Sequence, residues 1–433
     1  MPDQPVHTPD ESRAHRFVRP PLSRRSFLQR TAVASLGAAS LTTFLDACAS
    51  SNINGVTPSG SAALQIASPS NPVLWPINAD NPIIAAGQKP EQGGVLQLYN
   101  YADYIDPNAI KSFEKKYAAY NVKVQVSTFN DTDEAMTKIR GGNVPYDMYW
   151  PSYDQISRLV NGKLIRPLQQ SYIPNIANVW PSFHNPWYDQ QWRYSVPYTV
   201  YTTGVGWRGD QVKQDIGALP NPYASLWDPQ YRGKTAVIDD WHTAMMLPLL
   251  KAGGTDMNVT DPAQIQGIGT QLTALQAATK PVVTITMYNT IATGQVGLSQ
   301  FWSGDMVNAV SYLPTGQSPK VLNYWFPPDG KGSVDNDLMV VLAKGKCPVL
   351  AHLFIDHMLD TPTSLGNFSF IGYQPPQVSI NPTQLVKDGY LPANLASCTV
   401  LPEYFDVGFR LLEMSPSVTS LWLQQWQKFK AGG

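Results

Sequence analysis

Three residues that follow the first expected strand combine a carboxylate with aromatic rings. The alternating run at 95–99 predicts a strand, and Tyr101, Asp103 and Tyr104 come directly after it. A carboxylate pairs with a cation, and the faces of aromatic rings attract cations as well. Ligands bind at the carboxyl ends of strands in α/β sheets, which favours a binding site here. The alternative is a polar loop in which Asp103 only caps the next helix.

The histidines lack the sequence context of a catalytic site. None of those after residue 47 lies in a Gly-x-Ser-x-Gly, His-Glu-x-x-His or P-loop motif; they are His184, His242, His352 and His357. The neighbouring acids Asp239 and Asp240 could be mistaken for an acid/base pair, but adjacent side chains commonly point apart. We therefore expect a protein that is not an enzyme and that carries no cofactor or metal.

The amino-terminal segment has the pattern of an export signal with a lipid attachment site. Arg24 and Arg25 precede an apolar run at 31–45, as in twin-arginine signals, and the run is too short to span a bilayer. It ends in Leu-Asp-Ala-Cys, which is similar to a lipobox, although Asp46 is unusual at its place. We expect export by the twin-arginine route, removal of residues 1–47, and a lipid on Cys48 that anchors the chain in the periplasm or at the cell surface. The alternative is an ordinary cleaved signal with Cys48 incidental.

Charge and composition restrict the class of partner. Only 15% of residues are charged, so a nucleic-acid partner is not expected. The chain after residue 47 has 25 basic and 28 acidic residues, a net charge of −3 that favours a cationic solute. Apart from Cys48, the chain has two cysteines, Cys347 and Cys398. Their spacing in the sequence does not decide between a disulfide and two free thiols.

The order of elements predicts two α/β lobes. A chain of 433 residues exceeds the size of a single hydrophobic core. Strands and helices alternate, which is typical of largely parallel sheets; strands are expected at 95–99, 122–126, 146–150, 234–238 and 338–342, and helices at 107–117, 131–140, 243–252, 261–277 and 349–359. Residues 49–93 are rich in Ser, Asn, Pro and Gly and predict a tether followed by an extended arm.

From residue 94 to the end, the chain resembles the periplasmic spermidine/putrescine-binding proteins. The most specific likeness is the Leu-Trp-Asp-Pro-x-Tyr-x-Gly-Lys run at 226–234; weaker ones, in the same order as in the family, lie at 99–105, 146–152, 195–198, 238–240, 301–304, 335–336, 371–373 and 427–432. The resemblance implies an α/β, two-lobed type II periplasmic binding fold with hinge crossings at 199–202, 333–337 and 374–379. It divides the chain into a signal (1–47), a tether and arm (48–93), a first lobe (94–199 plus 338–376) and a second lobe (200–337 plus 377–433).

The same resemblance implies a site for a polyamine between the lobes. Acids of the family hold the ammonium groups and rings enclose the methylene chain. The matching positions are Tyr101 (where a Trp is usual), Asp103, Tyr104, Ser152, Asp154 (where a Tyr is common), Asp240, Trp302, Asp335 or its neighbour Asn336, and Tyr373. The partners implied are the permease and ATPase subunits of an ABC importer.

Two departures from the family pattern leave the solute open. The acid expected three residues after Asp240 is Thr243, and the Trp expected before Asp335 is absent. Asp154 and Glu413 are candidate substitutes for the missing acid. A solute with one cationic end, such as an opine, an amino-acid derivative or a thiamine-like cation, is therefore an alternative to a polyamine. An anion or iron site of the same fold would call for Arg, or for clustered Tyr with His.

Overall fold

The computed structural model describes residues 65–130, 132–142 and 145–432. Arg24, Arg25 and Cys48, which carry the export and lipid predictions, lie outside these residues. Within the described ranges, no helix is both long enough and apolar enough to cross a membrane.

The first part of the sheet is parallel. Strands β1 (Val95–Tyr101), β2 (Lys123–Phe129) and β3 (Met148–Tyr149) run in the order β2-β1-β3. Helix α3 (Pro107–Lys116) connects β1 to β2 and begins where the Asp106 carboxylate accepts a hydrogen bond from the Asn108 N–H. Helices α4 (Thr132–Gly141) and α5 (Ile156–Asn161) follow β2 and β3. This arrangement places the carboxyl ends of three strands at one edge, as expected for a ligand site.

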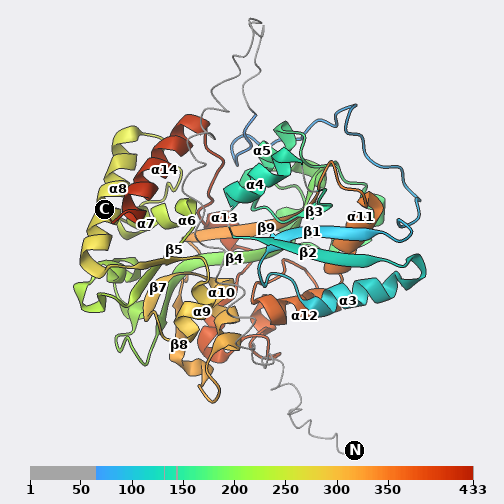
Figure 1. Ribbon diagram of the computed structural model, residues 1–433. Helices are drawn as coiled ribbons and strands as arrows, with labels where there is room; N and C mark the ends of the chain where they lie inside the picture. Colours follow the sequence, from blue (N-terminus) through green and yellow to red (C-terminus); the bar gives the residue numbers. More distant parts are fainter. Residues whose placement is uncertain (1–64, 131, 143–144, 433) are drawn as a thin grey trace, which may run out of the picture. The chain divides into compact units, whose positions relative to one another are not determined.

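Two long antiparallel strands join this part to the rest of the sheet. Strand β4 (Ser195–Arg208) pairs first with β9 (Ser333–Val341) and then with β7 (Leu298–Trp302) and β8 (Leu322–Trp325). Figure 1 shows both long strands passing through the middle of the sheet. The three predicted crossings lie side by side here, because Val200 pairs with both Asn336 and Gln374.

The second part of the sheet is parallel again, in the order β7-β5-β6. Its strands are β5 (Thr235–Ile238) and β6 (Val282–Thr284) beside β7. Its helices include α8 (Pro262–Thr279) and α14 (Pro416–Lys430), which pack side by side (Figure 1). The remaining α-helices of the described chain, apart from short 3-10 turns, are α6 (Trp241–Met245), α7 (Leu247–Lys251), α9 (Met287–Ala292), α10 (Ser303–Ala309), α11 (Pro348–Met358), α12 (Thr361–Ile371) and α13 (Tyr404–Val407).

Two separate hydrophobic clusters stabilise the two parts. One draws on residues between 67 and 194 and on 338–342, and the other on residues between 205 and 298 and between 411 and 429. The predicted arm belongs to the first cluster from residue 67 onward. Trp75 is 1% exposed and its indole N–H donates to the Tyr188 carbonyl at 2.8 Å. The exact lobe limits and a hinge motion at the crossings stay predictions.

The expected elements occur in the structure, most with limits shifted by one to three residues, and two differ more from their predictions. The helix expected at 243–252 is divided into α6 and α7, because Pro248 has no N–H to donate and its ring crowds the preceding turn. The strand expected at 338–342 is β9, which begins five residues earlier at Ser333. Both Cys347 and Cys398 are buried, free thiols.

Candidate ligand-binding site

All nine predicted ligand-binding residues line one cavity. They are Tyr101, Asp103, Tyr104, Ser152, Asp154, Asp240, Trp302, Asp335 and Tyr373. The complete lining contains eight aspartates, nine Phe, Tyr or Trp residues, and one arginine. Such a wall is acidic and aromatic, which suits a cation with an apolar body.

The end of β1 places the first group of these residues. Asp103 has φ 56°, an uncommon left-handed conformation for a residue other than glycine. Its carboxylate accepts a hydrogen bond from the Tyr312 hydroxyl at 3.1 Å. The Tyr101 and Tyr104 rings meet edge to face, with centroids 5.7 Å apart. The contact with Tyr312, which lies far away in the chain, thus holds Asp103 at the cavity wall. Asp103 therefore has a role beyond that of a local helix cap.

Asp337 is the buried acid that sequence analysis missed. Its carboxylate accepts hydrogen bonds from the hydroxyls of Tyr104 (2.7 Å), Ser152 (2.8 Å) and Tyr201 (3.2 Å). Burial raises the pKa of Asp337 to about 7. A cation in the cavity would stabilise the ionised form, so Asp337 is well suited to hold an ammonium group.

The alternation of β9 explains which of its polar residues face the cavity. Asp335 and Asp337 both line it, because side chains two apart lie on one face of a strand. Asn336 lies on the other face, where its amide donates to the Tyr188 hydroxyl and its carbonyl accepts from Arg410. The choice between Asp335 and Asn336 is thereby resolved in favour of Asp335 as the lining residue. The period-2 pattern Ser-x-Asp-x-Asp at 333–337 was the sequence signal for Asp337.

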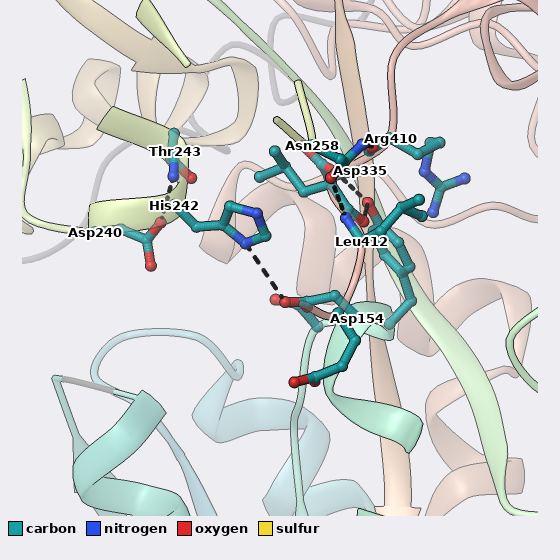
Figure 2. Close-up of polar contacts among 12 residues, drawn as sticks. Asp154, Asp240, His242, Thr243, Asn258, Asp335, Arg410 and Leu412 are labelled. Carbon is teal, nitrogen blue, oxygen red and sulfur yellow. Dashed lines mark hydrogen bonds and ion pairs between the residues drawn. The ribbon is translucent and has the colours of Figure 1, made fainter. Parts of the chain in front are cut away.

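Asp240 caps helix α6 and lies near two other ionisable groups. Its carboxylate accepts from the Thr243 backbone N–H at 2.8 Å, a cap that the backbone at position 243 provides whatever its side chain. Burial raises the pKa of Asp240 above its usual range. The His242 imidazole is turned toward Asp154, with Nδ1 and Oδ2 3.8 Å apart (Figure 2). Asp154 therefore brings a second carboxylate to the part of the cavity where the acid at position 243 is missing.

Aromatic rings form a continuous wall between these acids. The Tyr104 and Tyr373 centroids are 5.0 Å apart at 88°, those of Tyr201 and Tyr373 are 5.5 Å apart at 82°, and those of Tyr201 and Trp302 are 6.1 Å apart at 70°. These edge-to-face contacts fix the orientation of each ring by its neighbour. Trp302, at the end of β7, is partly exposed to the cavity, as a ring that lies against a ligand must be.

Tyr373 connects this wall to a further buried acid, Asp305. The Tyr373 hydroxyl donates to Asp305 Oδ1 at 2.8 Å, and burial raises the pKa of Asp305 to about 7. The Tyr373 ring rests on Gly304, where a Cβ atom would overlap it. Gly304 and Asp305, both in α10, thus set the position of a predicted wall residue.

The family comparison decides the class of protein. The model of the bacterial extracellular solute-binding proteins matches residues 108–393 of the chain. The chain belongs to this family. Its members bind solutes for transport.

Individual relatives agree with this assignment. The spermidine/putrescine-binding periplasmic protein 1 of Haemophilus influenzae is 26% identical over 311 residues, which are 71% of this chain and 82% of that protein. The putrescine/cadaverine-binding protein of Pseudomonas aeruginosa is 27% identical over 274 residues, 61% of this chain and 74% of the relative. A structure of a spermidine/putrescine ABC transporter protein from Listeria monocytogenes has a TM-score of 0.66 at 25% identity, and covers 78% of this chain and 98% of its own. The expected two-lobed, type II periplasmic binding fold is confirmed.

Proposed function

We propose that this chain is the substrate-binding component of an ABC importer and that it captures a polyamine in the cavity described above. The observation that carries the proposal is the cavity lining, which combines eight aspartates with nine aromatic side chains. Burying an ammonium group without a partner costs several kcal/mol, and acids placed along the cavity remove that cost. The relatives that bind putrescine and spermidine support the same ligand class.

The acidic and the aromatic residues of the cavity have different roles in binding. Asp337 and Asp240 accept hydrogen bonds from ammonium groups, and Asp103 and Asp154 add negative charge at the wall. Trp302, Tyr101, Tyr104 and Tyr373 enclose the methylene chain, each ring adding roughly 0.5 to 2 kcal/mol where it faces a cation. Ser152 donates to Asp337 and orients its carboxylate. Because Asp337 supplements the acids predicted from the sequence, the absence of an acid at position 243 does not prevent binding of two ammonium groups.

A thermal-shift panel tests the ligand class. Putrescine, cadaverine and spermidine should raise the melting temperature of the purified protein, since a ligand at 100 times its Kd stabilises the folded state by about 2.7 kcal/mol. Thiamine and an opine serve as solutes with a single cationic end, and sulfate as an anion. A shift with thiamine or the opine, and none with any polyamine at millimolar concentration, would replace the proposed ligand by one of the alternatives.

We further propose that the protein is exported by the twin-arginine route and anchored through Cys48, and that it delivers its ligand to membrane permease and ATPase subunits. The motifs at Arg24–Arg25 and 45–48 support this. Mass spectrometry of the native protein should find an amino terminus at a lipid-modified Cys48. Cys48→Ala should release the protein from membranes, while Arg24→Lys with Arg25→Lys should block its export. An unmodified amino terminus beyond residue 48 would contradict the anchor.

A further inference from the structure

Asp154 belongs to the first part of the chain but meets the second part at the cavity. It lies in the short 3-10 turn Tyr153–Gln155, and the Tyr153 ring packs in the first hydrophobic cluster. Its Oδ2 atom is 3.8 Å from Nδ1 of His242 in α6, and Figure 2 shows these two side chains turned toward each other. The Asp154 side chain lines the cavity and is 18% exposed, so a ligand can reach it.

The place of Asp154 is the part of the cavity where the sequence lacks an acid. Thr243 stands where the family pattern has that acid, and His242 directly precedes it. Asp240, the N-cap of the same helix, lines the cavity together with both residues. Burial raises the pKa of Asp240 above its usual range, and the nearby charge of Asp154 raises it further. A carboxylate from another segment thus lies near Asp240, although α6 itself supplies only one.

Two contacts, one on each side of Asp154, attach its turn and the following helix to a distant segment. Before it, the Tyr153 hydroxyl donates to the Leu411 carbonyl oxygen at 2.6 Å. After it, Arg158 in α5 binds Glu413 through two donors: Nε lies 3.1 and 3.2 Å from the two carboxylate oxygens, and Nη2 lies 2.8 Å from Oε1. This two-pronged contact is the strong form of an arginine–carboxylate pair and fixes its geometry.

The segment that makes these contacts is in turn fixed to the second part of the chain. Leu411 and Met414 pack in the second hydrophobic cluster. The Asn258 side chain binds the same segment twice: its amide donates to the Arg410 carbonyl at 2.8 Å, and its carbonyl accepts from the Leu412 N–H at 2.7 Å (Figure 2). The turn that carries the acid is therefore attached to a segment that is itself anchored in the second part.

The charges around Arg158 favour a cation in this region. Glu413 takes two of its donors, and its Nη1 atom lies 3.5 Å from Oδ1 of Asp133, another cavity residue. Asp154 also acts on the guanidinium, so three carboxylates share a single positive charge and the group as a whole is negative. The Arg158–Glu413 pair is thus a neutral support, and the negative charge at the cavity remains on the aspartates.

We propose that Asp154 takes the place of the acid absent at position 243 and accepts an ammonium group together with Asp240, and that Arg158 and Glu413 are positioning residues that hold Asp154 there. This inference rests on the proposed polyamine function. The physical cause is that a hydrogen bond to a ligand depends on the placement of the acceptor, which a short turn does not fix by itself. An acid from one part of the chain is thus held close to an acid from the other part.

Calorimetric titration of the full chain and its variants with putrescine tests the proposal. Asp154→Asn should weaken binding at least about tenfold, because an ammonium group loses its anion. Arg158→Met with Glu413→Gln removes one charge of each sign at similar volume, and should weaken binding at least about fivefold by releasing Asp154. When Asp154→Asn is already present, the same two substitutions should change the affinity by less than about twofold, because residues that act through one another are not additive.

Lys163→Met with Asp80→Asn is the matched control. It also removes one charge of each sign, from an exposed ion pair whose residues are not among those of the cavity, and should leave the putrescine affinity unchanged. If the Arg158→Met, Glu413→Gln variant does not fold, as judged by circular dichroism, Arg158→Lys replaces it. The lysine keeps the charge but cannot form the two-pronged contact, so it should weaken binding at least about threefold, and only while Asp154 is present.

The outcomes separate this inference from the function on which it rests. If the wild type binds putrescine and Asp154→Asn binds it as tightly, the inference is overturned and the polyamine function stands. Equal losses from the Arg158 substitutions with and without Asp154 would show a general structural effect and overturn the positioning role. A wild type that binds neither putrescine, cadaverine nor spermidine overturns the proposed function itself.

Discussion

Asp337→Asn is expected to weaken diamine binding by about 30-fold or more. The substitution keeps the shape of the side chain but leaves an ammonium group without its buried anion, a loss of about 2 to 5 kcal/mol. In the wild type, Asp337 accepts hydrogen bonds from the hydroxyls of Tyr104, Ser152 and Tyr201. In the variant, these hydroxyls would lose a charged acceptor as well. Isothermal titration calorimetry with putrescine measures the change directly.

The pH dependence gives the same variant a second readout. Burial raises the pKa of Asp337 to about 7, far above its value in an unfolded chain, so the ligand-free fold takes up a proton there. The stability that this proton provides is present below about pH 4 and is lost as the pH rises through 7. Binding of a cation requires the ionised form, so affinity should rise between pH 6 and 8, by at most about tenfold per pH unit for each such acid. Asp337→Asn should flatten this rise and leave the part due to Asp305, whose pKa is also raised to about 7.

Asp189→Asn is the matched control for these measurements. Asp189 is fully buried, and burial raises its pKa to about 7 as well, but it accepts hydrogen bonds from Ser195 and Tyr194 and is not among the cavity residues. Its replacement should change stability with pH and leave the Kd for putrescine unchanged. An Asp337→Asn variant that binds as tightly as the wild type would remove Asp337 from the site.

Gly304→Ala is expected to disrupt the aromatic wall. The added Cβ would overlap the Tyr373 ring, so this ring must move. It would then lose its hydrogen bond to Asp305 and its edge-to-face contacts with Tyr104 and Tyr201. Overpacking of this kind costs about 1 to 3 kcal/mol of stability, and we expect putrescine affinity to fall at least about tenfold because the ring no longer faces the ligand.

Gly267→Ala is the control variant for Gly304→Ala, because it makes the same substitution at a different helix position. Gly267 also lies in a helix, α8, but nothing is within 4 Å of the position that its Cβ would take. The variant should be equally stable or more stable by about 0.5 to 1 kcal/mol, with unchanged binding. Equal effects of the two alanines on putrescine binding would show that the Tyr373 position is unimportant.

The cavity residues that the sequence identified share a local signal. Tyr101, Asp103 and Tyr104 follow a strand whose alternation is plain, and Asp240 follows another, so their place at the strand ends could be predicted. Family resemblance added Trp302 and Tyr373, which no local pattern in the sequence singled out. All of these lie on the cavity wall.

Residues that depend on long-range pairing were missed. Strand β4 is buried along its whole length, so it lacks the polar and apolar alternation of a half-exposed strand, and Tyr201 within it was not recognised. Asp337 was overlooked because β9 was expected to begin only at residue 338, although the two-residue spacing from Asp335 was visible. Glu413 was considered as a substitute acid, but the structure pairs it with Arg158. Such pairing of segments far apart in the chain leaves no local pattern from which to predict it.

Calorimetric titration of the purified wild-type protein with putrescine is the most direct test of the proposed polyamine capture. We expect one diamine to bind per chain, with affinity that weakens at acidic pH and is reduced strongly by Asp337→Asn but not by Asp189→Asn. Saturable binding with this pattern would support the cavity as the ligand site. No heat of binding for putrescine, cadaverine or spermidine at millimolar concentration and pH 8, confirmed by the absence of any thermal shift, would contradict polyamine capture and leave a solute-binding protein for a different ligand.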